Sequence, residues 1–393
     1  MISVNQALEI VQNNINPTQH SELKDTKNAL GNVLYRDIVS PINMPPFNQS
    51  AMDGYALHLH ESSNYQIIGE IKAGDDSHPT LQKGEGVRIF TGAAVPESAN
   101  AVVMQERVSI TNQNLILDTK VSLQENIRPI GEQVNKDQIA LKKGTVLTPA
   151  AVAFLSTLGI TKVSVYKKPS IAIIVTGNEL VEAGQSLTYG LIYESNSIML
   201  TSALNSLGYP NVKTHKVDDN YEHTVDLLWE AMSAYDMVII SGGISVGDYD
   251  FVGKALQELE VKELFYKVKQ KPGKPLFFGK TKSCVVFALP GNPAAALSCY
   301  YIYVQTALQI MSGNSSYTLS KTIAQSQSNY VKKGNRSQFL KAIYKHGNVE
   351  ILEGQSSAML QTFAIANAFV VMPESLQTIN INDDVEVILL PLN

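Results

Sequence analysis

The 393-residue sequence has few of the features that mark zinc proteins. It contains only two cysteines, Cys284 and Cys299, which lie in apolar surroundings and are not spaced like paired metal ligands. Its seven histidines are scattered without an HxxxH or HxH pattern, so no zinc site is expected. We expect both cysteines to be small core residues without a further role.

Long apolar runs and an excess of positive charge are also missing. No apolar stretch approaches the roughly 20 residues that span a bilayer, and the opening MISVNQALEI lacks the basic flank and apolar block of a targeting signal. The formal net charge of −5 gives the whole molecule no electrostatic reason to bind nucleic acid. We therefore expect a soluble cytoplasmic protein that binds neither membrane nor nucleic acid, and whose anionic ligands are attracted by a local basic patch.

The composition, 44% apolar and 17% charged residues, is that of an ordinary globular protein. At this length we expect about two to four domains. Apolar spacing predicts helices over residues 3–14, Leu23–Leu34 and Leu147–Leu158, and a strand over Lys162–Tyr166. We expect residues 1–40 and 137–167 to form one discontinuous helical domain.

Residues 41–136 have a different pattern, in which apolar and polar residues alternate in short segments bounded by Gly, Pro, Asn or Asp. This pattern predicts an elongated β-rich domain. The alternating segments are Tyr65–Ile71, Gly86–Phe90, Ala101–Val108 and Asn114–Leu117.

From residue 168 to residue 315, short apolar strands alternate with helices, which predicts a parallel sheet covered on both faces. The predicted strands are Ser170–Val175, Asn211–Val217, Asp236–Ile240 and Ser283–Leu289. The predicted helices are Asn196–Leu207, Tyr221–Ala234 with Trp229 on its apolar side, and Ala294–Met311. Residues 316–393 alternate again and predict a small C-terminal β domain. The expected fold class is therefore a multidomain α/β and β protein.

Three of these strands end in loops that contain glycine, and open parallel sheets bind ligands at that edge. The first loop is Thr176-Gly177-Asn178-Glu179, and the third is Pro290-Gly291-Asn292-Pro293. The second reads SGGISVGDYD from Ser241 to Asp250 and includes Gly242, Gly243, Ser245 and Gly247. Glycine lets backbone N–H groups approach an anion. One such loop is more often a tight turn, but three at one edge favour a binding site.

The segment Tyr266–Lys282 contains six lysines and no acidic residue. Lys267, Lys269 and Lys271 alternate, so in an extended strand they would face one side, roughly 7 Å apart. One interpretation is a solvated edge strand that lysine protects from aggregation. The other is a site for a small dianion or phosphates. The KPGKP turn favours the second, because rigid prolines hold Lys271 and Lys274 close together at an electrostatic cost that a bound anion offsets.

Five carboxylates follow the predicted strands of the same sheet: Glu179, Asp218, Asp219, Asp248 and Asp250. Singly, each is more often a cap or turn residue. Together with bound phosphates they can complete a Mg²⁺ site, since this ion usually takes one or two carboxylates plus phosphate and water. The sequence offers no persuasive Ser–His–Asp or Cys–His set, so no protein nucleophile is expected.

Five motifs occur in an order known from one family. They are SAMDGYA at residues 50–56, FTGAAVP at 90–96, SGGISVGDYD at 241–250, KPGKP at 271–275 and LPGNP at 289–293. The chain resembles the molybdopterin molybdenumtransferases, the MoeA family to which the gephyrin E domain belongs, over essentially its whole length. SGGxSxG and PGNP alone are less specific, because related pterin-binding domains share them, whereas SAMDGYA with the others is highly specific.

The resemblance implies a homodimer of four-domain subunits that acts with other enzymes of molybdenum cofactor biosynthesis. It implies a Mg²⁺-dependent reaction in which adenylated molybdopterin and molybdate yield molybdenum cofactor and AMP. The catalytic residues that it implies are Asp53, Asp218, Asp250, Lys271 and Lys274, with Glu179, Asp218 and Asp250 as metal ligands. The implied pterin- and nucleotide-binding residues are Thr91, Arg128, Thr176, Glu179, Gly242, Gly243, Ser245, Gly247, Pro290, Gly291, Asn292 and Pro293. Lys271, Lys274, Arg336 and Ser357 resemble the molybdate-holding set, and Asp53 and Thr91 are implied to reach the pocket across the dimer.

One position departs from the family pattern. After Arg128 many members read RGED, whereas this chain reads PIGEQ and has an amide at Gln133. This argues against a direct metal role at Gln133 and leaves Glu132 as a candidate substitute.

Two other functions are consistent with parts of the sequence. One is a different enzyme on the same pterin-binding sheet, an adenylyltransferase or a nucleotide amidohydrolase. The SAMDGYA domain and the C-terminal β domain argue against it, because a minimal adenylyltransferase needs neither. The other is a scaffold, since gephyrin-like proteins also bind receptor tails. The absence of a long linker or fused partner domain argues against scaffolding as the main role.

Overall fold

The computed structural model describes residues 1–244 and 251–391, and its contacts divide the chain into two units. Unit 1 consists of Met1–Glu22 and Tyr166–Asn393, and unit 2 of Leu23–Val165. None of the helices in the described ranges has the length and apolar character needed to cross a membrane.

The described part of unit 1 is built on a six-stranded sheet in the order β16-β13-β17-β21-β20-β18. Four neighbours are parallel: β16 (Val212–Val217), β13 (Ile171–Thr176), β17 (Met237–Ser241) and β21 (Val285–Leu289). Two antiparallel strands, β20 (Phe277–Lys280) and β18 (Lys262–Tyr266), extend the sheet beyond β21. The predicted parallel sheet is thus confirmed for its first four strands, and one edge is antiparallel instead.

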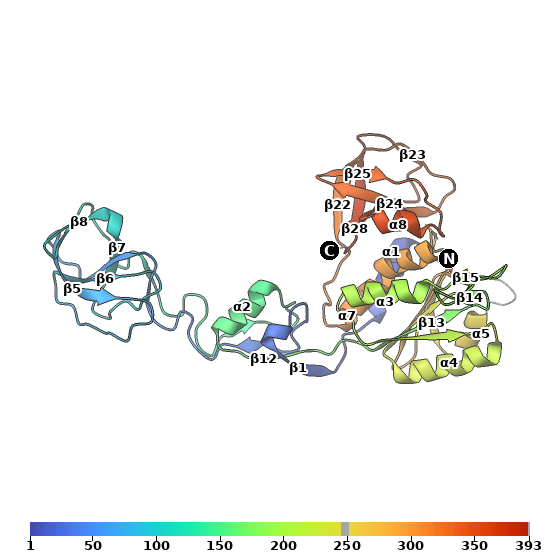
Figure 1. Cartoon of the computed structure of the whole chain (residues 1–393), viewed down its shortest axis with the longest axis horizontal. Helices are drawn as coiled ribbons and strands as arrows, with labels where there is room; N and C mark the ends of the chain where they lie inside the picture. Colours follow the sequence, from blue (N-terminus) through green and yellow to red (C-terminus); the bar gives the residue numbers. More distant parts are fainter. Residues whose placement is uncertain (245–250, 392–393) are drawn as a thin grey trace. The chain divides into compact units, whose positions relative to one another are not determined.

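Helices cover both faces of this sheet, as Figure 1 shows. On β13, Ile171 and Ile173 face one apolar cluster while Ala172 and Ile174 face another. The first cluster includes α3 (Asn196–Ser206), α6 (Pro293–Cys299), the π-helical turn η3 (Tyr300–Val304) and α7 (Gln305–Met311). The second includes α4 (Tyr221–Ala234) and α5 (Phe251–Glu258). Burial on both faces explains why β13 reads as a continuous apolar run.

The expectation that Trp229 lies on the apolar side of α4 is wrong, because its side chain is 61% exposed. Leu228, Ala231 and Met232 face the core instead. These three residues follow the spacing of three to four that places side chains on one helical face, and Trp229 is one position off that face.

The N-terminal helix α1 (Val4–Asn14) belongs to unit 1. Ser3 and Gln6 form a reciprocal capping box at its start. Its buried residues Ala7 and Val11 join the apolar cluster that also contains Ile171. By their contacts residues 1–22 belong to unit 1, and the predicted discontinuous domain of residues 1–40 and 137–167 stays a prediction.

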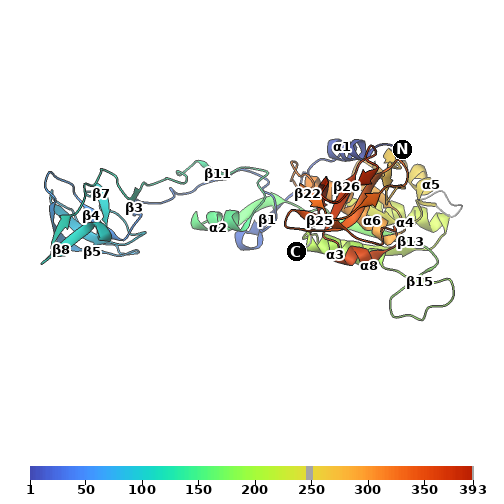
Figure 2. The same cartoon turned by 90° about the horizontal axis from the view of Figure 1, so that it is seen from above.

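The C-terminal strands of unit 1 close into a small barrel. The ring is formed by β24 (Ser337–Lys345), β25 (Asn348–Ile351), β22 (Lys321–Ser326), β28 (Asp384–Leu389) and β26 (Ala368–Met372), which pairs again with β24. The short strand β19 (Gln270–Lys271) joins β24 in parallel, and β23 (Tyr330–Val331) pairs with β27 (Thr378–Ile379). Helix α8 is Leu360–Ile365. Figure 2 shows a long loop between β14 (Leu180–Val181) and β15 (Ile192–Tyr193) that extends away from the sheet.

The described residues of unit 2 contain a further six-stranded sheet, in the order β7-β4-β6-β5-β9-β8. Its strands are β4 (Gly54–Leu57), β5 (Asn64–Ile71), β6 (Glu85–Ile89), β7 (Ala101–Met104), β8 (Val108–Thr111) and β9 (Asn114–Leu117). This sheet confirms the predicted β-rich region, although the expected run Ala101–Val108 is interrupted by the 3₁₀ turn η2 (Gln105–Arg107). Beside it, β3 (Gln49–Ser50) pairs with β10 (Ile127–Arg128).

The rest of unit 2 combines two separated pieces of chain. β1 (Ser21–Asp25) pairs with β12 (Lys162–Tyr166), and β2 (Ile38–Val39) pairs with β11 (Ile139–Leu141), next to α2 (Pro149–Thr157). The predicted helix Leu23–Leu34 is wrong, since strand β1 covers its first residues and the 3₁₀ turn η1 (Thr26–Asn28) follows. The Thr26 backbone N–H donates to Thr161 O (2.9 Å) and its hydroxyl donates to Ile160 O (2.7 Å). These long-range bonds replace the local ones of a helix.

Candidate active site

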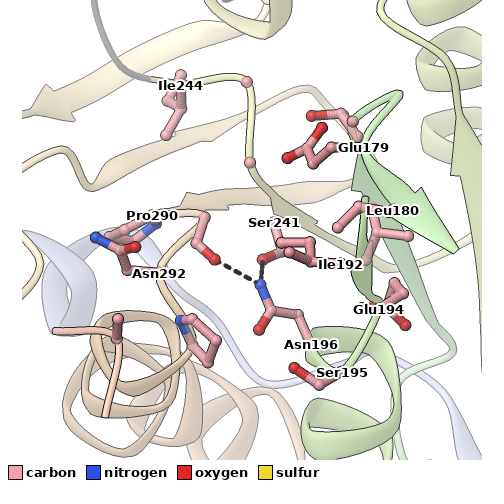
Figure 3. Close-up of a pocket in the computed structure, with 18 of the residues that line it drawn as sticks. Glu179, Leu180, Ile192, Glu194, Ser195, Asn196, Ser241, Ile244, Pro290 and Asn292 are labelled. Carbon is pink, nitrogen blue, oxygen red and sulfur yellow. Dashed lines mark hydrogen bonds between the residues drawn. The ribbon is translucent and has the colours of Figure 1, made fainter. Parts of the chain in front are cut away.

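A cavity of about 670 Å³ lies at the carboxyl ends of β13, β17 and β21 in unit 1 (Figure 3). The three loops singled out from the sequence all contribute to its wall, so the topology brings them together at one sheet edge. Its lining residues are Val175, Thr176, Gly177, Glu179, Leu180, Ile192, Tyr193, Glu194, Ser195, Asn196, Asp219, Ser241, Gly242, Gly243, Ile244, Pro275, Pro290, Gly291, Asn292, Pro293 and Ala358. Ser245, Gly247, Asp248 and Asp250 lie outside the described residues.

Two glycines let the second loop pack against the first. Gly242 and Gly243 have φ angles of +99° and +62°, in the left-handed region that favours glycine. A Cβ on Gly242 would lie 2.9 Å from Thr176 Oγ1, and a Cβ on Gly243 would lie 2.7 Å from a methyl group of Val252. The backbone at this point therefore lines the cavity without a side chain in the way, which leaves room for a ligand to approach it.

Asn196, the first residue of α3, connects the second and third loops (Figure 3). Its Nδ2 donates to Ser241 Oγ and to Gly291 O, each at 2.8 Å. A carbonyl oxygen only accepts, so the bond to Gly291 fixes which way the amide points. Ser241 accepts through its oxygen, so its own hydroxyl hydrogen stays available for another acceptor. The Oδ1 atom of Asn196 is buried without a partner.

Two carboxylates from different loops line the cavity, Glu179 and Asp219. Asp219 is held by Asn178, whose backbone N–H donates to Asp219 Oδ2 (3.2 Å) while Asn178 Oδ1 accepts from the Asp219 backbone (3.1 Å). Asp218, one residue earlier, is exposed and is not among the lining residues. The metal role predicted for Asp218 stays a prediction, and the cavity itself presents Asp219.

In the described ranges no group of three or more His, Cys, Asp or Glu side chains is placed to hold a metal ion. Glu194, a further lining carboxylate, accepts from the Ser197 backbone at 2.9 Å and from the Ser197 hydroxyl at 2.5 Å, at the start of α3. Glu179 and Asp219 are the carboxylates that remain, and two carboxylates suit Mg²⁺ when a phosphate ligand completes its coordination.

The lysine-rich segment does not form the single row that alternation predicts. Lys267 has a φ of +66° and its ammonium lies 4.5 Å from the Tyr266 ring centroid. Lys269 approaches Glu374 at 3.7 Å. Between Lys267 and Lys271, only Gln270 and Lys271 belong to a strand, β19, which pairs with β24 of the barrel. The expectation of an extended strand with Lys267, Lys269 and Lys271 on one side is therefore wrong, because the chain turns at Lys267.

Two residues of the expected molybdate set, Lys274 and Ser357, are each next in sequence to a residue that lines the cavity. Lys271 and Lys274 are exposed, and Pro275, next to Lys274, lines the cavity. Ser357 Oγ accepts from Asn292 Nδ2 at 3.0 Å, and its neighbour Ala358 also lines the cavity. Arg336 Nη1 donates to the carbonyl oxygen that precedes Lys271, at 3.2 Å.

In unit 2, Asp53 and Thr91 are directly bonded. The backbone N–H and the hydroxyl of Thr91 both donate to Asp53 Oδ1 at 2.7 Å. The backbone bond, then the hydroxyl bond and the nearby charge of Arg88, hold the pKa of Asp53 below its ordinary value despite some desolvation. Asp53 therefore stays ionised. Gly54, which follows it, is required because a Cβ there would lie 1.8 Å from Val103 O.

The other predicted site residues of unit 2 have exposed side chains. Arg128 is exposed at the end of β10, opposite Gln49. Gln133 donates its backbone N–H to Met44 O at 2.8 Å, and its side chain and that of Glu132 are exposed.

Comparison with known proteins covers almost the whole chain. A family model described as "MoeA N-terminal region (domain I and II)" matches residues 2–159, "Probable molybdopterin binding domain" matches 172–309, and "MoeA C-terminal region (domain IV)" matches 324–390. The molybdopterin molybdenumtransferase of Haemophilus influenzae is 33% identical over 94% of both chains, and that of Staphylococcus epidermidis is 31% identical over 100% of this chain and 96% of its own. This chain belongs to the molybdopterin molybdenumtransferase family.

The fold agrees with this membership. Two crystal structures of the molybdopterin biosynthesis MoeA protein from Pyrococcus horikoshii resemble this chain with TM-scores of 0.79 and 0.85, at 31% and 29% identity. Each comparison covers 99% of this chain, and 99% and 100% of the other. The molybdopterin molybdenumtransferase family places the chain among the enzymes of molybdenum cofactor biosynthesis. The matches at 2–159 and 324–390 argue against a minimal adenylyltransferase, because these regions lie outside the pterin-binding sheet.

The sequence did not predict every residue that lines the cavity. Asn196 and Glu194 are two that it did not identify. Asn196 follows Ser195 at a helix start, where such residues usually serve as caps, and this local explanation concealed its contacts with Ser241 and Gly291. The contribution of Glu194 was missed for the same reason. Both residues are separated in sequence from the glycine loops with which they share the cavity wall.

Proposed function

We propose that this chain inserts molybdenum from molybdate into adenylated molybdopterin and releases AMP in a Mg²⁺-dependent reaction. The observation that carries the proposal is the convergence of three loops on one cavity that has carboxylates and a basic turn at its border. Glu179 and Asp219 line it, and Pro275 brings the KPGKP turn to its edge. Family membership supports the chemistry, because the curated relatives carry the name molybdopterin molybdenumtransferase.

Binding of the adenylated pterin falls to the loops at the sheet edge. The backbone around Gly242 and Gly243 is open to a phosphate group, and the Ser241 hydroxyl has its hydrogen free to donate. Thr176, Asn292 and the prolines of the third loop complete the wall. Ser245, Gly247 and Asp250 belong to the same proposal through the family motif.

Glu179 and Asp219 would hold Mg²⁺ together with phosphate oxygens of the substrate, and Asp218 and Asp250 remain proposed ligands from the family pattern. When bound, the ion neutralises charge at the phosphoanhydride group and so assists its cleavage. The carboxylates of the chain contribute only binding and orientation, which agrees with the absence of a persuasive protein nucleophile in the sequence.

Lys271, Lys274, Arg336 and Ser357 would bind molybdate at the border of the cavity. In the reaction an oxygen of molybdate attacks the phosphorus of the pterin phosphate, the phosphoanhydride bond breaks, and AMP departs as the leaving group. The bond between that oxygen and molybdenum then breaks, which leaves the oxygen on the pterin phosphate and passes molybdenum to the pterin. The ammonium groups of Lys271 and Lys274 stabilise the negative charge that develops. Holding molybdate and the pterin phosphate in the orientation for attack supplies the remaining rate acceleration.

A homodimer in which Asp53 and Thr91 of one subunit serve the cavity of the other completes the proposal. Their mutual bonds keep the carboxylate ionised and oriented. A cytoplasmic location and contact with other enzymes of cofactor biosynthesis belong to the same proposal, and both rest on the role of the family.

The deciding experiment combines purified protein with adenylated molybdopterin, Mg²⁺ and molybdate. We expect AMP and active molybdenum cofactor to appear together and to require all three additions. ATP is supplied in a parallel reaction with unadenylated molybdopterin. Consumption of ATP there, with no AMP release in the first reaction, would identify an adenylyltransferase and contradict the proposal.

A further inference from the structure

A buried hydrogen-bond network lies directly beneath the KPGKP turn. Its centre is Gln270, whose side chain is fully buried although the residue is polar. Gln270 Oε1 accepts from the Tyr303 hydroxyl at 2.5 Å, and its Nε2 donates to Gly273 O at 3.1 Å. The same Nε2 lies 3.4 Å from Cys299 Sγ. Both ends of the amide are therefore bonded, as a buried amide must be to avoid a large desolvation cost.

The turn rests on this network without spare room. Gly273 has a φ of +86°, and a Cβ there would lie 2.4 Å from Cys299 Sγ and 2.9 Å from Gln270 Nε2. The carbonyl of Gly273 points into the network, while Lys271 and Lys274 on either side of the Pro272-Gly273 pair are exposed. The position of the Gly273 carbonyl thus sets where the two lysine backbones lie.

Gln270 also contacts the third cation of the set. Its backbone carbonyl accepts from Arg336 Nη1 at 3.2 Å, and its strand pairs with β24 next to Arg336, where Gln270 is opposite Ser337. A single buried residue therefore links the lysine turn with the arginine. Holding like charges together costs electrostatic energy, so a rigid support is needed to keep the cations in place before an anion arrives.

The support comes from the π-helical turn η3. Such turns within α-helices are uncommon and often occur near functional sites. Here the turn contains two fully buried tyrosines with different surroundings. Tyr303 OH donates to Gln270, whereas Tyr300 OH is buried without a hydrogen-bond partner. Tyr303 and Tyr300 therefore form a matched pair for a test, because only the Tyr303 hydroxyl bonds to Gln270.

We infer that Gln270 and Tyr303 are positioning residues that hold the KPGKP turn and Arg336 in the arrangement that binds the oxyanion. The inference rests on the proposed function, since it assumes that molybdate binds at Lys271, Lys274 and Arg336. Neither positioning residue touches the substrate. Their effect reaches the anion through the Gly273 carbonyl and through the backbone of Gln270.

The test compares Tyr303→Phe with Tyr300→Phe, and each variant loses one buried hydroxyl from the same turn. For each protein, AMP release is titrated with molybdate and, separately, with adenylated molybdopterin. Binding of molybdate alone is measured by calorimetry. We expect Tyr303→Phe to need roughly three- to tenfold more molybdate, the range for losing one neutral hydrogen bond, with little change in the pterin requirement. Tyr300→Phe should match the wild type in both titrations.

Lys274→Ala is the reference that separates this inference from the proposed function. If Lys274→Ala raises the molybdate requirement and Tyr303→Phe does not, the inference is overturned and the anion site stands. If neither variant shifts the curve, molybdate binds elsewhere and both ideas fail. Equal shifts for Tyr303→Phe and Tyr300→Phe, or an equal change in the two substrates' requirements, would show general packing damage and also overturn the inference. Gln270→Met provides a second variant, for which the same selective loss of molybdate affinity is expected.

Discussion

The ammonium group of Lys341 donates to the carbonyl oxygen of Gly354 at 2.8 Å inside the C-terminal barrel domain. It also donates to Ser356 O (3.2 Å) and Met359 O (3.0 Å), and the lysine is only 3% exposed. Burial lowers its pKa, but the carbonyl oxygens replace the water that the charge has lost. All three acceptors belong to the loop that carries Ser357, so a single buried charge fixes the loop beside the cavity.

Replacing this lysine by Lys341→Met should therefore loosen the Ser357 loop. We expect a loss of about 1–3 kcal/mol in the free energy of unfolding, because buried carbonyls lose their donor, and a higher molybdate requirement. Denaturant unfolding and a molybdate titration measure the two effects. Lys332→Met is the control, since Lys332 is also buried and donates to Pro373 O (2.6 Å) and Glu374 O (2.9 Å) in another loop. If both variants raise the molybdate requirement equally, the effect is not specific to the Ser357 loop.

The link between two glycine loops predicts a defect in pterin binding for Asn196→Asp. The carboxylate cannot donate to Gly291 O, and its charge would repel that carbonyl oxygen. Losing two donated bonds should cost about 1–3 kcal/mol, which raises the half-saturating concentration of adenylated molybdopterin roughly five- to 150-fold. Asn205→Ala, at an exposed position of the same helix, should behave as the wild type. An unchanged titration for Asn196→Asp would remove this residue from the account of the cavity.

Glu179→Gln should raise the Mg²⁺ concentration needed for AMP release. The substitution keeps the size of the side chain at the cavity wall and removes the charge that attracts a hard cation. Glu182→Gln, on the exposed loop after β14, is the matched control. Asp218→Asn and Asp219→Asn are titrated beside it. Since Asp219 lines the cavity, we expect it to have the larger effect of the two, and the reverse result would favour the family pattern over the cavity geometry.

The lowered pKa of Asp53 predicts a pH-dependent contribution to stability. An aspartate whose pKa falls on folding stabilises the fold above its ordinary value of 3.8, and this contribution is lost as the pH falls through the lower folded value. Thr91→Val keeps the backbone donor and removes the hydroxyl donor. We expect it to be less stable than the wild type near neutral pH, with the difference disappearing at acidic pH. Thr91→Ser retains the hydroxyl and should restore most of the difference. A difference that is constant with pH would point to packing of the threonine methyl group instead.

Mixed dimers test whether subunits share their sites. Asp53→Asn subunits and Glu179→Gln subunits are each expected to be nearly inactive alone when Mg²⁺ is kept below the concentration that the Glu179→Gln variant needs. If Asp53 serves the opposite subunit, random mixing yields intact sites amounting to about one quarter of the total, because one site of each mixed dimer is unaltered. Recovery of activity on mixing, measured as AMP release, supports sharing. No recovery from dimers shown to be mixed would mean that Asp53 acts within its own subunit.

Much of unit 1 could be predicted because its signals are local. The apolar run of β13 and the glycines at 242 and 243 follow from what a strand between two helical layers and a left-handed turn require of their own residues. Family motifs such as SAMDGYA and KPGKP are also local signals, since each consists of a few consecutive residues. The strand–loop–helix order alone then places three loops at one edge of the sheet.

The wrong predictions concern segments whose conformation is decided by contacts with residues far away in the sequence. Leu23–Leu34 has the apolar spacing of a helix, but Thr26 bonds to residues 160 and 161 instead. Lys267 to Lys271 alternate like a strand, yet the chain turns and only two residues pair with the barrel. The apolar face of α1 is evident in the sequence, whereas the core that it joins is not.

The sequence by itself therefore determined the strands that are buried on both faces, because their residues are apolar throughout. It also determined which motifs carry the chemistry. Tertiary structure decided which neighbours those motifs meet. It brought Asp219 rather than Asp218 to the cavity, placed Asn196 between two loops, and buried Gln270 beneath the lysine turn. The physical reason is that a hydrogen bond or a buried charge depends on distances between residues far apart in the chain. Those distances are fixed only when the whole core packs.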